Sequence, residues 1–168
     1  MPLMSGITEE EKRYIIHRTR EELIRRAVDQ RVVTTKEEAI VRDMKPTDLD
    51  YATQVWEQSV VADAWTNTYT PDPTTKRLFA FYGVRNAAAL PLTTAIRFGL
   101  GAGPAVIKDE WEVESAWIED NTEGITNDII IYDKEDRITI AQYSTTTGTD
   151  KVVLLGLVCE KSGETVVH

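Results

Sequence analysis

The sequence contains few of the residues on which most enzymes and metal proteins depend. Its 168 residues include one cysteine, Cys159, and two histidines, His17 and His168. A single cysteine excludes a disulfide within the chain, and its position in an apolar run indicates a buried side chain rather than a nucleophile. The two histidines provide neither a zinc ligand set nor a catalytic triad. We therefore predict no catalytic, cofactor-binding or metal-binding residues, and a protein that is not an enzyme.

Positive charge is also scarce. The formal net charge is −9 and the isoelectric point is about 4.8, which argues against nucleic acid and anionic membranes as partners. Residues 1–45 hold ten Lys and Arg against nine Asp and Glu, whereas residues 46–168 hold nine against nineteen. An almost neutral, arginine-rich N-terminal part thus precedes an acidic body. This part is either a solvated charged helix or a segment that docks on an acidic partner.

Long apolar runs are missing as well. No run of about 18 apolar residues occurs, so we expect no membrane-spanning helix. Residues 1–6 lack a basic region followed by an apolar one, so we expect no secretory signal. With 42% hydrophobic and 28% charged residues, the composition is that of a folded globular protein, and the length suits one domain with an arm. The single thiol suits a reducing compartment, or a virion assembled in one.

Two segments match known binding loops poorly. Residues 99–104 contain three glycines, but they do not form the dinucleotide fingerprint and no helix is predicted after them, so we interpret them as a wide loop or a sheet corner. Residues 119–124 place oxygen ligands at alternate positions, as a calcium loop does. The twelfth position would be Ile130, where an EF-hand needs Glu. We interpret this segment as a turn between strands and predict no calcium-dependent fold.

The second half of the chain is rich in strand signals. Residues 127–132, 138–144 and 152–159 are runs of β-branched and apolar residues separated by polar clusters. Residues 133–136 predict a hairpin loop between the first two runs. The third run is apolar on both of its faces, which predicts a central strand that is covered on both sides.

Further strands are predicted before these runs, at residues 78–84, 92–98, 106–107 and 111–118. In and just before the strand predicted at residues 111–118, three glutamates alternate with residues that can pack in a core. This alternation indicates one solvent-exposed, acidic face and one buried face. These residues are Glu110, Glu112 and Glu114 on the wet face, and Trp111, Val113, Ser115 and Trp117 on the packed face. Together the runs predict an antiparallel, jelly-roll-like β-sandwich of seven or eight strands.

The N-terminal part is predicted to be helical. Thr8 and Glu11 have the spacing of a capping box that opens a helix to about Gln30. The polar surface of this helix suits packing by one narrow edge, on its own domain or on another chain. Shorter helices are predicted over residues 35–43 and 47–59, before a proline-containing loop at residues 69–75. The predicted organisation is a helical arm at 1–45, a linker with a short helix at 46–77 and a β-sandwich at 78–168.

Several segments resemble accessory structural proteins of tailed viruses, which are jelly-roll or related β-domains found on capsids. The segments are residues 81–86, 94–99, 111–114, 130–132 and 154–160. The resemblance spans residues 78–165, and it identifies no functional residue in this sequence. It implies a virion protein that is assembled in the host cytoplasm, decorates or cements a capsid, and binds its own copies and a major capsid or other virion protein. The helical arm would equally suit a head–tail connector or tail component.

We predict that the arm forms the interface with a partner. An isolated helix of this length has marginal stability in water, so it must pack against another surface. The predicted interface residues are Ile16, Leu23 and Ala27 on its apolar edge, and Arg20, Arg25 and Arg26 beside them. Contact within one subunit and contact across subunits both satisfy this pattern, and we favour contact across subunits. Two alternatives are a receptor- or glycan-binding sandwich that uses loops 69–75 and 144–150, and a hydrolase based on paired carboxylates.

Overall fold

A computed structural model gives the fold of residues 8–102, 106–114 and 123–163. The described residues form helix α1, Glu9–Asp29, two short 3-10 helices, η1 at Lys36–Glu38 and η2 at Pro46–Leu49, and ten strands. The strands are β1 Ala39–Asp43, β2 Gln58–Val60, β3 Ala64–Tyr69, β4 Arg77–Asn86, β5 Thr93–Leu100, β6 Val106–Glu112, β7 Glu123–Tyr132, β8 Ile138–Ser144, β9 Gly148–Asp150 and β10 Val152–Lys161.

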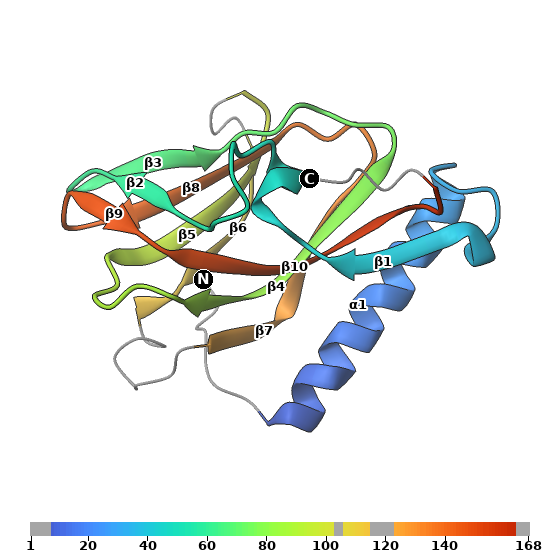
Figure 1. The fold of residues 1–168 in the computed structure, drawn as a ribbon, viewed down its shortest axis with the longest axis horizontal. Coiled ribbons are helices and arrows are strands. Elements are labelled where there is room, and N and C mark those ends of the chain that lie inside the picture. Colours follow the sequence, from blue (N-terminus) through green and yellow to red (C-terminus); the bar gives the residue numbers. More distant parts are fainter. Residues whose placement is uncertain (1–7, 103–105, 115–122, 164–168) are drawn as a thin grey trace.

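The strands form two antiparallel four-stranded sheets and a small ribbon. Sheet I has the strand order β1-β10-β4-β7, sheet II has the order β3-β8-β5-β6, and β2 pairs with β9. One cluster of buried side chains takes members from both sheets, so the sheets pack face to face. Helix α1 lies against the outer face of sheet I (Figure 1). The described chain is therefore mainly β, with an N-terminal helix on a sandwich-like pair of sheets.

Aromatic side chains fill the space between the sheets. The ring of Phe81 on β4 lies 5.1 Å from that of Phe98 on β5 and 6.1 Å from that of Tyr132 on β7, between ring centroids. Phe98 in turn lies 4.6 Å from Trp111 on β6. All four residues are buried, and tilted or edge-on ring contacts add to the free energy of apolar burial. This group of rings joins sheet I to sheet II.

Strand β10 confirms the predicted central strand. It lies between β1 and β4, with Leu154 and Val158 in the core between the sheets and Leu157 and Cys159 in the core beneath α1. This alternation is the one that a pleated strand covered on both faces requires. At Gly156 an added Cβ would lie 2.5 Å from a backbone oxygen of β4, so a side chain at this point would force the two strands apart.

Helix α1 begins at the predicted capping box and packs on sheet I through one apolar stripe. The backbone N–H of Glu11 donates to Thr8 Oγ1 at 3.1 Å, and the N–H of Thr8 donates to the Glu11 carboxylate at 3.2 Å, which is the predicted capping box. One stripe of the helix with four-residue spacing is buried: Ile15, Thr19, Leu23 and Ala27. The helix and the outer face of sheet I thus remove each other's apolar surface from water.

The prediction of two short helices after α1 is wrong. Within residues 35–43 only η1 is helical, and Ala39–Asp43 forms β1 at the edge of sheet I. Within residues 47–59 only the end of η2 is helical, and β2 follows. Short helices have marginal stability without packing, whereas pairing with β10 satisfies the backbone groups on one side of β1 and suits its β-branched residues.

The predicted hairpin at residues 133–136 is also wrong. The turn exists, but β7 pairs with β4 in sheet I and β8 pairs with β3 and β5 in sheet II. The turn therefore carries the chain from one sheet to the other. Residues 106–112 form one strand, β6, where two short strands were predicted. The predicted packed face of the segment is confirmed at Trp111 and Val113, which are both buried. Residues 115–118 lie outside the described residues.

The chain before residue 78 belongs to the same body as the sandwich. Strand β1 pairs with β10, β3 with β8 and β2 with β9, and α1 covers sheet I. Residues 39–43, 58–60 and 64–69, which lie within the predicted arm and linker, thus contribute strands to the sheets. The reason is that the outer edges and outer face of residues 78–163 need these segments for pairing and cover.

A buried ionic cluster fixes β1, η2, β4 and β10 to one another. Arg42 donates to Asp48 Oδ1 at 2.7 Å and to Glu160 Oε1 at 2.8 Å, while Arg77 lies 3.5 Å from Asp48 and 3.2 Å from Glu160. Burial raises the pKa of Asp48, but the hydrogen bonds from Arg42 and from the backbone N–H of Lys45 outweigh burial and lower it below its ordinary value. Two guanidiniums and two carboxylates balance one another, which buried charges require.

The packing of β10 can be tested with a matched pair of leucines. Leu154 is 2% exposed, whereas Leu90 is 75% exposed. We expect Leu154→Ala to lower the free energy of unfolding by about 2–5 kcal/mol through lost burial and a cavity. We expect Leu90→Ala to change it by less than about 0.5 kcal/mol. Urea denaturation measures both, and equal losses would contradict the central position of β10.

The role of α1 can be tested by truncation. Deleting residues 1–31 removes Leu23 and Ala27 and exposes the apolar outer face of sheet I. We expect the remaining chain to unfold or aggregate, because several buried side chains become exposed to water. Each such exposure lowers the free energy of unfolding by about 1.5–3 kcal/mol. Circular dichroism and mass measurement report the outcome. A soluble, folded truncation with a cooperative melting transition would show that the helix is not part of the core.

The buried ionic cluster predicts acid sensitivity. Because the folded-state pKa of Asp48 lies below its unfolded value, its contribution to stability is complete above the unfolded pKa and is lost as the pH falls through the folded one. We expect the free energy of unfolding to fall as the pH drops below about 4. Asp48→Asn should cost about 3 kcal/mol at neutral pH and flatten this fall. Denaturant titrations at several pH values measure it, and parallel curves for the two proteins would contradict the assignment.

Candidate functional site

The apolar edge of α1, predicted to be an interface, is used inside the subunit. Leu23 and Ala27 are completely buried against sheet I, and Ile16 packs against the same cluster. The favoured contact across subunits is therefore wrong for these residues. The physical reason is that sheet I presents an apolar outer face, and the helix supplies the nearest apolar cover for it.

The arginines of α1 lie on the outside of this contact. Arg25 donates to Glu22 at 2.6 Å, and Arg26 donates to Glu22 at 2.9 Å and to Asp133 at 2.9 Å. The hydrogen bonds from the two guanidiniums lower the pKa of Glu22 to about 2. Arg20 is exposed. Arg26 thus ties the helix to the turn after β7, so the acidic surface that it was predicted to meet lies in its own chain.

With α1 on sheet I, the outer face of sheet II is the sheet surface that the helix leaves open (Figure 1). Residues on this face alternate with core residues such as Ile96 and Trp111. The strand register places two rows of side chains across it: Trp65, Tyr143, Ala95 and Glu112 in one row, and Asn67, Ala141, Arg97 and Glu110 in the next. The described structure thus offers a flat platform with two aromatic residues at the β3 edge and acids at the β6 edge.

The centre of this platform is held in a fixed arrangement. The guanidinium carbon of Arg97 lies 4.0 Å from the ring centroid of Trp65, and Arg97 Nε donates to Glu110 at 2.8 Å. The ring of Trp65 meets that of Tyr143 edge-on at 5.5 Å. A cation held over an aromatic ring and tied to a carboxylate loses rotamer freedom before any partner arrives. The platform is therefore pre-organised.

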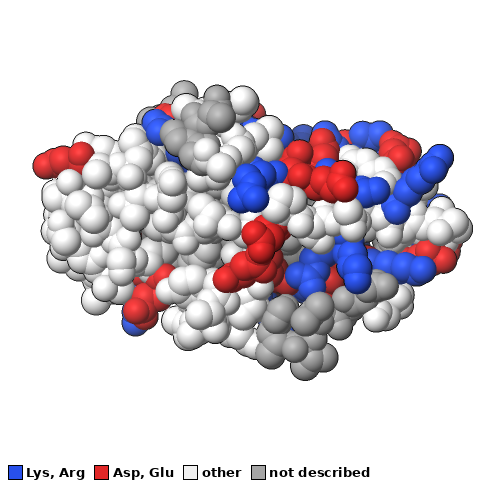
Figure 2. All heavy atoms as spheres, turned by 90° about the horizontal axis from the view of Figure 1, so that it is seen from above, with Lys and Arg blue, Asp and Glu red and all other residues white. Residues whose placement is uncertain are grey.

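Charge is unevenly distributed beside this platform. On the face seen in Figure 2, charged side chains gather on one half, whereas the half over β2, β3 and β9 shows few of them. Residues 58–70 contain one charged residue, Asp63, and residues 139–149 contain none. We name this surface the uncharged face. It comprises Val61, Trp65, Asn67, Tyr143, residues 145–147 and Thr149.

Of the two predicted contact loops, only residues 144–150 contribute to this surface. In residues 69–75, Tyr69 is buried, while Asp72 and Pro73 are exposed. In residues 144–150, Ser144 and Asp150 are buried and the last three residues form β9, which leaves residues 145–147 exposed. Residues 145–147 are three threonines, so the tip of this loop is polar and carries no charge.

A buried polar network supports the uncharged face from beneath. Gln58 on β2 donates to the Tyr69 hydroxyl at 2.7 Å, Gln142 donates to Thr93 Oγ1 at 2.9 Å, and Thr93 donates to Asp150 at 2.6 Å. All five side chains are buried. Satisfied polar networks of this kind hold their members in one arrangement. They fix the β2–β9 ribbon to the main sheets, so the surface above is rigid.

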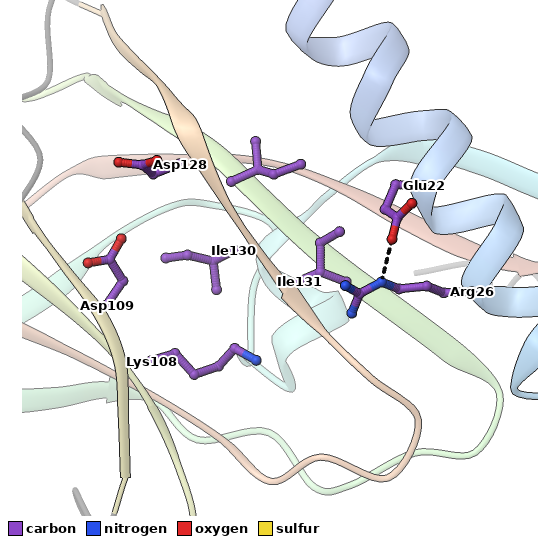
Figure 3. A pocket seen from close by; sticks show the side chains of 8 residues that line it. Glu22, Arg26, Lys108, Asp109, Asp128, Ile130 and Ile131 are labelled. Carbon is purple, nitrogen blue, oxygen red and sulfur yellow. Dashed lines mark hydrogen bonds and ion pairs between the residues drawn. The ribbon is translucent and has the colours of Figure 1, made fainter.

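A second surface lies beside the edge of sheet I. It is a hollow of about 510 Å³, which we name the β7 trough (Figure 3). Its lining comprises Glu22 and Arg26 from α1, Lys108 and Asp109 from β6, and residues 128–131 of β7. Figure 3 shows Asp128 and Ile130 directed to the β6 side of the strand and Ile131 directed to α1. The backbone edge of β7 thus runs between two walls, each with one acid and one base.

The described residues group no side chains for a metal ion, and their one thiol is buried. Within residues 8–102, 106–114 and 123–163, no three His, Cys, Asp or Glu side chains are grouped so that they could hold a metal ion. In the same part of the chain, no helix has the length and apolar character that crossing a bilayer needs. Burial raises the pKa of the Cys159 thiol to about 11, which keeps it protonated and unreactive at neutral pH. The calcium-like segment lies mostly outside the described residues.

Sequence reasoning missed both surfaces. The uncharged face had a readable signal, because two segments that together hold one charged residue, Asp63, stand out in a chain with 28% charged residues. They are far apart in sequence, and only the pairing of β3 with β8 brings them together. The β7 trough had no such signal, since its walls come from three segments whose contact depends on the packing of α1 and on sheet order.

No protein-family model matches the chain, and no curated protein matches it. Among solved structures it is similar to the pili that form Bacillus endospore appendages, at 8% identity and a TM-score of 0.37, over 73% of this chain and 88% of that one. It is also similar to the C-terminal CBM6 module of a marine laminarinase from Zobellia galactanivorans, at 14% identity and a TM-score of 0.34, over 73% and 100%. A third is the VP2 subviral particle of infectious bursal disease virus, at 11% identity and a TM-score of 0.25, over 77% and 29%. Likenesses of this strength assign no function.

Proposed function

We propose that this chain is a non-enzymatic structural protein that binds another protein through the uncharged face. The observation that carries the proposal is the scarcity of charge over β2, β3 and β9 in a protein with net charge −9. A surface that only faces water usually carries many charges of both signs, whereas the centre of a protein interface is depleted of charge and enriched in aromatic residues. Trp65 and Tyr143 supply the aromatic residues here.

Within this class we propose a virion protein that decorates or cements a capsid, assembled in the host cytoplasm. The support is the resemblance of the strand segments to jelly-roll accessory proteins of tailed viruses, together with the fold of two packed antiparallel sheets. The partners would be a major capsid or other virion protein and further copies of this chain. A head–tail connector or tail component would use the same face in the same way.

Glycan or receptor binding is the second candidate, and one observation favours it. Trp65 and Tyr143 lie on a flat sheet face beside Asn67 and Glu110, and sugars stack on such rings while polar groups bind their hydroxyls. One face of the Trp65 ring is, however, already occupied by Arg97 at 4.0 Å. A stacked sugar would need the other face or would have to displace a paired guanidinium, so we place this candidate second.

A charge introduced into the uncharged face tests the proposal. Asn67 is exposed on β3, and Thr34, exposed after α1, offers a matched polar control. The binding partner in this test is particles of the major capsid protein of the same virus. We expect Asn67→Arg to weaken binding to them by about tenfold or more, or about 1.4 kcal/mol, because an unpaired charge must be desolvated. We expect Thr34→Arg to leave binding within about twofold. Co-sedimentation measures both, and melting temperatures confirm that both variants are folded.

The result that contradicts the proposal is equal binding by wild type and Asn67→Arg. A gene with no capsid, portal or tail gene beside it would contradict the virion assignment. For the second candidate, a glycan array with wild type and Trp65→Ala is decisive. Wild-type binding to defined glycans that Trp65→Ala loses would replace protein binding with glycan binding as the function of this face.

A further inference from the structure

A hollow of about 340 Å³ opens at one end of sheet II. Its lining comes from residues 90–94 at the start of β5, from residues 145–146 after β8 and from Glu114 after β6. The segments before β5 and after β8 lie at the left end of the molecule in Figure 1. Leu90, Pro91 and Leu92 make part of the lining apolar, and Leu90 is 75% exposed. A hollow lined by apolar side chains that face water is suited to receive apolar groups of a partner.

Hydrogen bonds within the chain hold this hollow in shape. The backbone N–H groups of Leu92 and Thr93 donate to the buried Asp150 carboxylate at 3.2 and 2.8 Å. On the β8 side, the N–H of Thr146 donates to Ser144 Oγ at 3.0 Å, and Ser144 Oγ donates to the carbonyl of Thr146 at 2.6 Å. Because the hollow is already formed, a partner that enters it pays little ordering cost.

The opposite end of sheet II carries two exposed apolar side chains. Val106 and Ile107, at the start of β6, are 56% and 46% exposed. They lie where β5 ends, since Leu100 is paired with Val106 on one side and with Ile138 on the other. Strand β5 has eight residues, so the two ends of the sheet lie about 25 Å apart. The hollow therefore cannot cover the apolar pair of its own chain.

The two ends also differ in charge. Glu114 is exposed, and it is the charged residue among the described residues that line the hollow. At the opposite end Arg137 is exposed, and its carbonyl accepts from the N–H of Gly101 at 3.0 Å. Within the described residues, neither Glu114 nor Arg137 forms an ion pair. One end thus combines an apolar hollow with an acid, and the other combines an apolar pair with a base.

We propose that these two ends bind each other between copies of this chain, head to tail. Val106 and Ile107 of one copy enter the hollow beside Leu90 of the next copy. Arg137 of the first copy then pairs with Glu114 of the second. The second copy is the occupant that the hollow fits, because it carries both an exposed apolar pair and an exposed base on the same end of one sheet.

The order of the strands determines the rotation between copies. Strands β8 and β6 flank β5 in sheet II. The apolar pair lies on β6 and Arg137 precedes β8, whereas the threonines of the hollow follow β8 and Glu114 follows β6. A half-turn about the strand direction sets β6 of one copy against β8 of the next, so the apolar pair meets the hollow and the base meets the acid. The contact joins two different surfaces and does not close on itself, so copies add to an open linear assembly.

This inference does not rest on the proposed function, because Leu90 and Val106 lie outside the uncharged face. The hollow is small, so the area that one contact buries is also small. We therefore expect self-association that grows with protein concentration rather than a permanent oligomer.

Two variants that each disable one end test the contact. We expect Leu90→Asp and Val106→Asp each to weaken self-association by about tenfold or more, because an unpaired charge must be desolvated in the contact. Mixed in equal amounts, the two variants should form one-to-one dimers that do not grow, since each keeps one intact end. Val61→Asp makes the same change at a valine that is 53% exposed on the uncharged face, and it should self-associate as wild type does. Sedimentation velocity over a wide concentration range measures each protein and the mixture.

Charge reversal tests the ion pair. We expect Glu114→Arg and Arg137→Glu each to weaken self-association by about fivefold or more, because like charges then face one another. The double variant should return to within about threefold of wild type, since its swapped pair is again complementary. Melting temperatures show whether each variant is folded.

Four results would overturn the proposal. They are a wild-type chain that stays monomeric at every concentration, a folded Leu90→Asp or Val106→Asp variant that associates like wild type, a mixture of these two variants that stays monomeric, and charge reversals that the double change does not rescue. Val61→Asp separates this inference from the proposed function, because we expect it to weaken capsid binding and to leave self-association unchanged. Weaker self-association of Val61→Asp would place the contact between copies on the uncharged face instead.

Discussion

The burial of sheet I on both faces is the constraint on which the rest of the structure depends. Its central strand β10 directs Leu154 and Val158 toward sheet II and Leu157 and Cys159 toward α1. An apolar face left in water would cost about 25 cal/mol for each Å² exposed, so one layer must cover each side. Sheet II takes the inner face and α1 takes the outer one. The surfaces that remain are the outer face of sheet II and the edges of both sheets.

The packing of sheet I also determines which charged side chains form ion pairs within the chain. The acid–base pairs of α1 are made along the helix and to Asp133 in its own chain, and the buried carboxylates of Asp48 and Glu160 are matched by Arg42 and Arg77. These groups stabilise the fold and are committed to it. The uncharged face lies away from them, over strands that the buried Gln58 network holds in place, so its lack of charge is a property of a rigid surface.

Two separate surfaces stand out among the described residues. The uncharged face lies on sheet II and the β7 trough lies at the edge of sheet I. The pre-organised platform of Trp65 and Arg97 would reduce the ordering cost of the protein binding that we propose for the uncharged face.

The sequence by itself determined the local features: the capping box of Thr8 and Glu11, the two-faced strand β10, and the packed side of the segment at Trp111 and Val113. Each is encoded within about ten residues by spacing and by side-chain chemistry. Only the tertiary structure decided that residues 39–43 pair as a strand, that the turn at 133–136 changes sheets, that Leu23 is buried in its own subunit, and that two charge-poor segments meet. A local pattern shows which side of a segment is apolar. It does not show which segment covers that side, because the energy of that choice comes from contacts between residues far apart in the chain.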